Sequence, residues 1–224
     1  MRFMRISALS AIAVLSLAAG KANWTATVNV TDAGSHVLGN PDAPTKLTEF
    51  VSYTCDHCAT FQKQSDAPLR IAYVMSGNVS VKVQHLLRDP IDLTVAMLTN
   101  CGDPKGFFKR HHTFLYQQDK WMAKMSGITS ERRQQWSHGE LRNRLRAVAR
   151  DFGFYAIMEQ QGYRRTRVDS CLADTKMAER LAAQSEAARQ LGVKGTPSFA
   201  INGELLDATH DWTALQPKLK AALD

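Results

Sequence analysis

Long apolar runs, cysteine and clustered charge are all scarce in this chain. Beyond residue 22 no uncharged segment reaches the roughly 20 residues that a membrane-spanning helix needs. No group of lysines and arginines is interleaved with aromatic residues, which argues against a nucleic-acid-binding surface despite the formal net charge of +7. Repeats and low-complexity segments are missing too. The 224 residues are therefore expected to form one well-packed domain, with or without a large insertion.

Residues 1–22 differ in kind from the rest of the chain. Arg2 and Arg5 precede an uncharged stretch rich in Ala and Leu, residues 6–19, and small residues follow it. This order is typical of a secretory signal peptide, so we expect cleavage near Ala22 and an exported mature protein. The alternative is an uncleaved membrane anchor. Cleavage would remove three positive charges and leave a mildly basic chain.

Only four cysteines are present, and all of them follow the predicted signal peptide. An exported protein meets an oxidising compartment, where an even number of cysteines suggests disulfides. Two residues separate Cys55 from Cys58, which favours this pair over the other two connectivities and leaves Cys101 with Cys171. We prefer to interpret the second pair as a structural disulfide. A second redox pair or two buried free cysteines are its alternatives.

The first part of the chain, residues 23–90, has the pattern of an α/β fold. An extended lead-in with one short strand at 25–30 is followed by an apolar strand at 46–51 that ends at the cysteines. Helical spacing over 56–75 and strict alternation over 79–87 then predict a helix, kinked at Pro68, and a strand. The order is strand, CxxC at the start of a helix, and strand.

The pattern then changes twice. Residues 91–173 show only helical spacing, which predicts an all-helical insertion. Residues 174–224 return to a mixed pattern, with a helix capped by Asp174, a short strand at 198–201 and a final helix. Asn202-Gly203 is the preferred dipeptide of a tight hairpin. The predicted fold class is α/β, in two segments separated by the helical insertion.

A CxxC pair at the start of a helix favours a reactive thiol. Unpaired backbone N–H groups and the positive end of the helix dipole converge on the sulfur of Cys55 and stabilise its thiolate. Cys58 lies one turn inside, where it can attack a mixed disulfide formed at Cys55. His57 can donate a hydrogen bond or positive charge to the thiolate, whereas the negative charge of Asp56 should raise the pKa of that thiol.

These residues resemble the thioredoxin superfamily, and specifically the DsbA-like thiol:disulfide oxidoreductases of the bacterial envelope. Cys55-Asp-His-Cys58 is similar to the family's Cys-Pro-His-Cys, and Glu49 stands at the position of the family's buried carboxylate. The segment Gly192–Gly203 resembles the loop whose proline is cis, and the helical insertion is the family's architecture. The resemblance extends from Val37 to Asp224.

The resemblance implies a thioredoxin fold with an inserted all-helical domain and a periplasmic enzyme that introduces disulfides into exported proteins. It implies that Thr196 and Pro197 contact substrate, and that Glu49 accepts the proton of Cys58 through water. A snorkelling or salt-bridged residue at a strand edge is the alternative for Glu49. The implied partners are unfolded or partly folded exported proteins and a quinone-coupled membrane reoxidase. No metal and no cofactor beyond the redox-active disulfide of Cys55 and Cys58 are implied.

Two departures from the family's pattern keep a second function open. Asp56 replaces the proline of many oxidases, and Thr196 is more similar to the isomerase and reductase branches. Those isomerases resemble dimers built through a separate N-terminal domain, for which residues 23–44 are too few. We therefore expect a monomeric oxidase, with an isomerase or reductase as the alternative.

Rival functions of other classes are a thiolate metal-binding module and a binding-only thioredoxin-like domain. Zinc prefers four ligands, and no second CxxC or ligand cluster accompanies Cys55 and Cys58. His111 and His112 are adjacent on a predicted helix, so they point in different directions, one to the core and one to the surface. Both cysteines of the pair are present, which argues against a purely binding domain.

Overall fold

A six-stranded sheet forms the centre of the computed structural model, which describes residues 22–223; the rest of the predicted signal peptide lies outside them. The strand order is β1-β2-β4-β3-β5-β6. Strands β3 and β4 are parallel, and every other pair of neighbours is antiparallel. The strands are β1 (Val28–Val30), β2 (His36–Gly39), β3 (Thr45–Val51), β4 (Val79–His85), β5 (Ser198–Ile201) and β6 (Glu204–Leu205).

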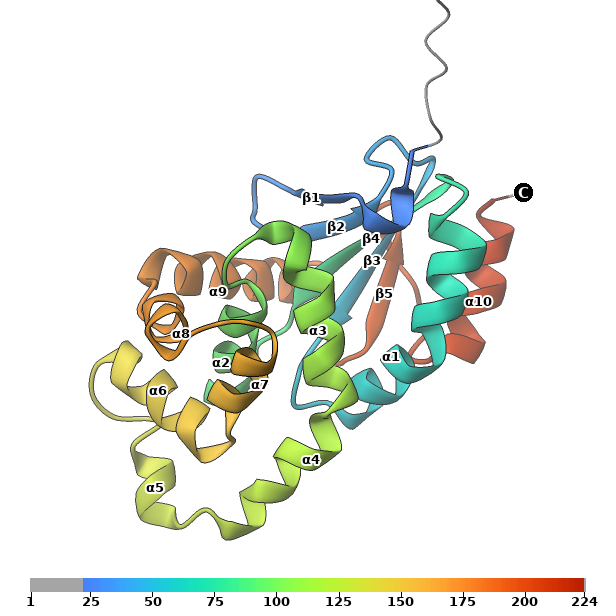
Figure 1. Cartoon of the computed structure of the whole chain (residues 1–224). Helices are drawn as coiled ribbons and strands as arrows, with labels where there is room; N and C mark the ends of the chain where they lie inside the picture. Colours follow the sequence, from blue (N-terminus) through green and yellow to red (C-terminus); the bar gives the residue numbers. More distant parts are fainter. Residues whose placement is uncertain (1–21, 224) are drawn as a thin grey trace, which may run out of the picture.

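Helices cover both faces of the sheet and form a separate group beside it (Figure 1). Helices α1 and α10 lie on one face, α9 packs against β4 on the other, and α2 to α8 make up the helical group. The α-helices are α1 (Asp56–Pro68), α2 (Pro90–Thr99), α3 (Phe107–Tyr116), α4 (Gln118–Met122), α5 (Ser130–Gln134), α6 (Leu141–Asp151), α7 (Phe154–Gln160), α8 (Arg165–Leu172), α9 (Thr175–Gln190) and α10 (Trp212–Ala221). Shorter turns are the 3-10 helices η1 (Trp24–Ala26), η3 (Pro104–Gly106) and η4 (Ala123–Gly127), and the π-helix η2 (Leu69–Val74).

Acidic residues define the starts of three helices. The side chains of Asp89, Asp174 and Asp211 each accept hydrogen bonds from backbone N–H groups in the first turn of α2, α9 and α10. Such caps satisfy donors that have no partner within the helix. The predicted cap at Asp174 is among them.

Alternation along β3 decides which side chains face which helices. Phe50 packs with Leu86, Ala188 and Ala200 on the side of α9. Leu47 and its period-two neighbours Glu49 and Val51 point to the opposite side, toward α1. The strand therefore directs a carboxyl group into the largest apolar cluster, beneath α1.

The predicted fold, a thioredoxin fold with a helical insertion, is confirmed, and the structure adds detail at three places. Strand β2 was not predicted, because its four residues show no clear alternation. The predicted strand at 25–30 is a 3-10 turn followed by the short β1. The predicted helix 56–75 divides at Pro68, where a kink was expected: α1 ends there and η2 begins. Proline has no N–H to donate, which favours a change of hydrogen-bond pattern at this point.

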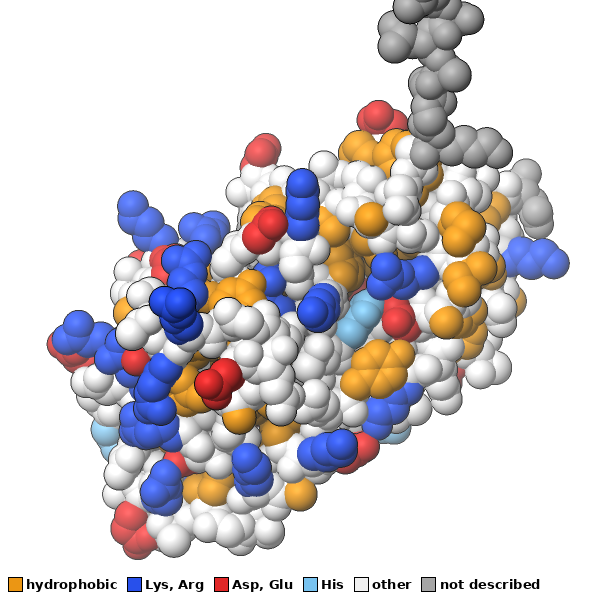
Figure 2. Space-filling view, in the orientation of Figure 1, with side chains coloured by type: hydrophobic (Ala, Val, Ile, Leu, Met, Phe, Trp, Pro, Cys, Tyr) orange, Lys and Arg blue, Asp and Glu red, His pale blue; other side chains and the backbone are white. Residues whose placement is uncertain are grey.

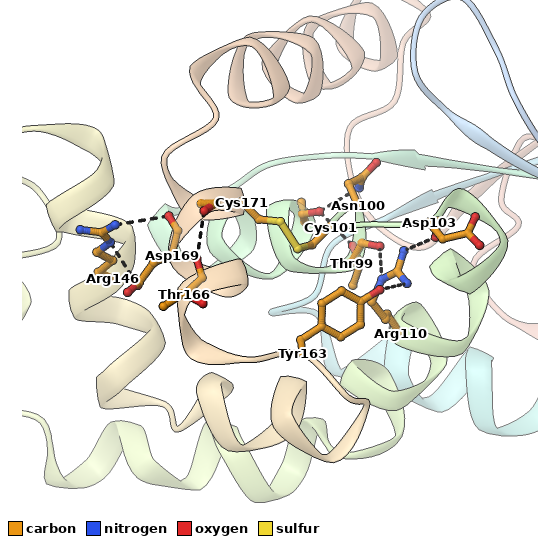
Figure 3. Close-up of a disulfide and its surroundings, with 12 residues drawn as sticks. Thr99, Asn100, Cys101, Asp103, Arg110, Arg146, Tyr163, Thr166, Asp169 and Cys171 are labelled. Carbon is orange, nitrogen blue, oxygen red and sulfur yellow. Dashed lines mark hydrogen bonds and ion pairs between the residues drawn. A yellow bond between two sulfur atoms is a disulfide. The ribbon is translucent and has the colours of Figure 1, made fainter.

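A disulfide between Cys101 and Cys171 joins the end of α2 to α8 (Figure 3). Beside it, the buried guanidinium of Arg110 donates to the carbonyl oxygens of Thr99 and Asp103 and to the hydroxyl of Tyr163. No carboxylate of the described residues forms an ion pair with this arginine. The segment around Cys101 is thus held by one covalent bond and by charge-assisted hydrogen bonds.

Candidate active site

The CxxC pair lies where β3 ends and α1 begins. Cys55 is the N-cap of α1 with an extended backbone, φ −97° and ψ 117°, and its carbonyl accepts the N–H of Ala59 at 3.2 Å. Cys58 is in the first turn and completely buried, whereas Cys55 keeps 4% of its surface exposed. Both are free thiols in this structure. The first sulfur is therefore the one that a substrate can reach.

The loop between α9 and β5 places Thr196 against Cys55, although 141 residues separate them in the chain. The Thr196–Pro197 peptide bond is cis. The thiol of Cys55 donates to the carbonyl oxygen of Thr196 at 3.1 Å. His210 donates through Nδ1 to the carbonyl oxygen of Pro197 at 2.8 Å and so connects this loop to the segment before α10.

The surroundings of the two sulfurs separate their acidities. The pKa of the Cys55 thiol falls from 9.0 to about 5, chiefly through its hydrogen bond with the Cys58 thiol. The nearby Thr196, the Cys58 N–H and the charge of Arg88 lower the pKa of this thiol further, against the effect of burial. Burial raises the pKa of Cys58 well above 9.0. At neutral pH the less buried sulfur, that of Cys55, is an anion, and the sulfur of Cys58 holds its proton.

Thr196 also has a hydroxyl that can donate a hydrogen bond to the Cys55 thiolate. Its Oγ1 is buried and has no hydrogen-bond partner among the described residues while both cysteines are thiols. An ionised Cys55 can no longer donate to the Thr196 carbonyl, but it can accept from the Thr196 hydroxyl. The same residue can therefore serve both protonation states of the sulfur.

The two residues between the cysteines do not surround the sulfur as the sequence suggested. The side chains of Asp56 and His57 are both exposed. Asp56 accepts the backbone N–H of His57 at 2.9 Å, and water screens its charge. Within residues 22–223 no hydrogen bond joins the imidazole of His57 to Cys55.

Glu49 lies beneath α1 in a central strand and is only 4% exposed. Its Oε1 has no hydrogen-bond partner, and the described residues provide it with no ion pair. Burial raises the pKa of this carboxyl to about 8. No hydrogen bond in the described part of the chain connects it directly to Cys58, so any proton transfer between the two groups needs an intermediary.

Because the pKa of Glu49 is raised, replacing it by glutamine should change how the free energy of unfolding depends on pH. A carboxyl whose pKa is higher in the folded state stabilises the protein most below its unfolded pKa, and this stability is lost as pH rises toward about 8. The free energy of unfolding of Glu49→Gln should therefore rise relative to that of the parent as pH rises. At neutral pH this relative gain should be about 3 kcal/mol. Urea unfolding from mildly acidic to mildly alkaline pH measures this difference. Glu204→Gln, at an exposed site, is the control. A difference that stays constant with pH would contradict the prediction.

Two residues that the sequence analysis missed hold the turn before Cys55. The amide of Gln118 in α4 donates to the carbonyl oxygens of Tyr53 at 2.6 Å and Cys55 at 2.8 Å. The buried carboxylate of Asp92 in α2 accepts from the Ser52 hydroxyl at 2.8 Å. Both come from the helical group, and no local pattern signals where their side chains point. The helices therefore fix the geometry of the CxxC turn.

No cluster of three or more His, Cys, Asp or Glu side chains able to hold a metal ion occurs within residues 22–223. None of the helices over the same residues is long and apolar enough to cross a membrane.

Comparison with known proteins agrees with this geometry. A family model described as thioredoxin matches residues 31–221. The chain belongs to the thioredoxin family. A solved protein-disulfide isomerase from Novosphingobium aromaticivorans is 44% identical to this thioredoxin-family chain, with a TM-score of 0.82 over 85% of this chain and 97% of that one. Wolbachia pipientis alpha-DsbA1 shares the fold, with 18% identity and a TM-score of 0.67 over 87% of this chain and 93% of that chain.

A curated relative is more distant and longer. The putative protein-disulfide oxidoreductase of Rickettsia bellii (strain RML369-C) is 28% identical over 174 residues, which are 77% of this chain and 58% of the relative. The chain thus spans less than two thirds of that relative's length. The resemblance to DsbA-like oxidoreductases of the thioredoxin superfamily is confirmed.

Proposed function

We propose that this thioredoxin-family protein is a periplasmic thiol:disulfide oxidoreductase that introduces disulfides into exported proteins. The observation that carries the proposal is the contrast between the two sulfurs, with Cys55 acidic and accessible and Cys58 buried and protonated. A thiolate of low pKa is a good leaving group, which favours transfer of the disulfide to a substrate. In the same proposal residues 1–22 direct export, and residues 91–173 form the helical domain between 23–90 and 174–224.

The reaction consists of two exchanges. A substrate thiolate attacks the sulfur of Cys55 in the Cys55–Cys58 disulfide, the bond between the two cysteines breaks, and Cys58 leaves and takes a proton. A second substrate thiolate then attacks the substrate sulfur of the mixed disulfide. Cys55 leaves as a thiolate, the substrate is oxidised, and the protein is reduced to the dithiol. Glu49 supplies the proton to Cys58 through water.

The substrates and the reoxidant follow from the same proposal. Unfolded or partly folded exported proteins present free cysteines, and an extended segment can pair with the backbone of Thr196 beside the sulfur. Pro197 shapes this contact. A quinone-coupled membrane protein restores the disulfide, and the protein acts as a monomer without a metal or an organic cofactor.

A disulfide isomerase or reductase is the second candidate. Thr196 before the proline favours it, and so does the name of the 44% identical relative, a protein-disulfide isomerase. The reduction potential measured against glutathione separates the two functions. A strongly oxidising value supports donation of disulfides, and a strongly reducing value supports the second candidate.

Two cysteine variants test the proposal. Cys58→Ser should accumulate a mixed disulfide at Cys55 with a protein that carries a disulfide, because the Cys55 thiolate attacks that disulfide and the sulfur that would resolve the complex is missing. Cys55→Ser should form no such complex and should not oxidise reduced ribonuclease. Non-reducing gels and mass spectrometry identify the linked cysteine. If Cys55→Ser still oxidises reduced ribonuclease, the proposed function is wrong.

A further inference from the structure

A small, partly open cavity lies next to Glu49. Its volume is about 20 Å³, room for one water molecule, and it lies between the sheet, α1 and α3. Glu49, Gln62, Ser65 and His111 are among its lining residues. Glu49 Oε1 and His111 Nε2 are both buried without a hydrogen-bond partner among the described residues. A water in the cavity can supply a hydrogen-bond partner to either atom.

One end of this cavity lies close to Cys58. Helix α1 places Cys58, Gln62 and Ser65 on one buried face, because residues three and four positions apart are neighbours on a helix. Gln62 and Ser65 line the cavity, which thus begins one helical turn from the buried sulfur. Glu49 is therefore within reach of Cys58 through polar groups of α1 and water.

The other end of the cavity borders an open groove. The groove has a volume of about 560 Å³ and lies between η1, β1 and α3. Four residues line both spaces: Leu38, Arg70, Phe108 and His112. Leu38 and Phe108 cannot carry a proton, and the guanidinium of Arg70 stays charged. Among the residues in this shared wall, His112 is the one able to accept a proton on one side and release it on the other.

His112 lies where its imidazole can exchange protons with solvent. Its Nδ1 lies 3.5 Å from Asp66 Oδ1, and its side chain is 15% exposed. Figure 2, in the orientation of Figure 1, shows the face that carries α3, where basic, acidic and hydrophobic side chains are interspersed. The neighbouring His111 is buried instead. The predicted core histidine is thus His111, whereas His112, predicted to lie at the surface, is only partly exposed.

We propose that His112, held by Asp66, is the proton-transfer residue that connects Glu49 to solvent. The inference rests on the proposed function, in which Cys58 must gain and lose a proton in every cycle. When Cys58 leaves as a thiolate, it takes the proton of the Glu49 carboxyl. The neutral His112 imidazole then takes a proton from solvent on one nitrogen and passes a proton to the Glu49 carboxylate through the cavity water, which leaves the imidazole neutral again. Reoxidation reverses each transfer, and no electrons move in these steps.

Charged groups on four elements face His112 and set its pH response. Asp66 of α1 raises its pKa, whereas burial and Arg70 of η2 lower it, with burial the larger cause. His111 and Lys109 lie on its own helix α3, and Lys105 of η3 lines the same groove. Removal of the carboxylate by Asp66→Asn should therefore move the pH profile of the Cys58 step to lower pH.

The test measures the single-turnover reaction of the oxidised protein with a thiol peptide in dilute buffer. His112→Gln should slow this step by about tenfold and change its pH profile, since a general acid is lost. His138→Gln, at an exposed site in the loop before α6, is the matched control and should behave as the parent. His112→Ala should recover its rate when imidazole is added, because the open groove admits a small base.

The outcomes separate this proposal from the function on which it rests. Slow turnover in Glu49→Gln, without rescue by imidazole, supports the whole route. If Glu49→Gln is slow but His112→Gln has the rate and pH profile of the parent, the role of His112 is wrong and that of Glu49 stands. If Glu49→Gln also reacts as the parent does, the role proposed for Glu49 fails. Slow His112→Ala that imidazole does not rescue shows a structural role and overturns the inference.

Discussion

Mild acid should destabilise this protein steeply, because three buried histidines must stay neutral in the folded state. Burial, and then the charge of Arg110, lower the pKa of His36 to about 4. Burial, and then His36, lower that of His85 to about 3. Burial lowers the pKa of His111 well below 6.5, and His112, His85 and His36 act in the same direction. All three imidazoles therefore bind protons more tightly in the unfolded chain, so a fall in pH favours unfolding.

Packing explains why these rings resist protonation. His36 stacks on Phe107 with centroids 3.9 Å apart, and Phe107 lies 5.6 Å from His111 and 6.1 Å from His85. Each histidine has one ring nitrogen without a hydrogen-bond partner among the described residues. A proton on any of these nitrogens would place an uncompensated charge in the core, close to the cation of Arg110.

The sign and size of the effect follow from linkage. A histidine with a lowered pKa in the folded state leaves stability intact above its unfolded pKa of 6.5, and stability falls as pH drops toward the folded value. Between about pH 7 and about pH 5, His36 and His85 should each contribute a loss of about 2 kcal/mol, to which His111 adds. Glu49 opposes this loss, since its raised pKa favours the folded state in acid.

Urea unfolding at the two pH values measures this loss. The free energy of unfolding should fall more steeply in Glu49→Gln than in the parent, because the carboxyl that favours the folded state in acid is gone. It should fall less in His36→Phe, in which the new ring can keep the stack on Phe107. His138→Gln should match the parent. Equal stability at the two pH values in both the parent and Glu49→Gln would contradict the prediction.

Loss of the Cys101–Cys171 disulfide should lower the free energy of unfolding by about 4 kcal/mol. The bond closes a loop with a sequence separation of 70, so it restricts the unfolded chain over much of the helical group. The hydrogen bonds of Arg110 to Thr99, Asp103 and Tyr163 remain when the bond is broken. We therefore expect a folded but less stable protein.

The comparison uses a background in which only this disulfide can form. In Cys55→Ser/Cys58→Ser, adding a reductant changes stability through Cys101 and Cys171 alone. Its urea midpoint should fall on reduction, to that of the variant in which Cys101 and Cys171 are also replaced by alanine. A midpoint that does not move on reduction would show that the bond contributes nothing to stability.

Local signals in the sequence were sufficient for much of the fold. The cap at Asp174, the hairpin at Asn202-Gly203 and the strand before Cys55 act over a few residues, so their patterns are readable without tertiary information. The four-residue β2 gave no such signal. It is a strand because it pairs with β4, which is a contact between distant segments.

The candidate site divides in the same way. The CxxC at the start of α1 and the threonine before the proline are visible in the sequence. The exposure of His57, the bonds from Gln118 to the turn and the cavity between Glu49 and His112 are not. Each of them depends on the direction of a side chain from another element.

From its residue order alone, this protein has a pair of sulfurs at a helix start, a carboxyl in a buried strand and a helical insertion between two α/β segments. These features depend on interactions between near neighbours in the chain. Only the folded arrangement decides that one sulfur is acidic and the other is not, and that a histidine stands between the buried carboxyl and water. The acidity of Cys55 depends on burial and on Thr196, 141 residues away, and proton access depends on side chains from separate elements, which meet only when the elements pack.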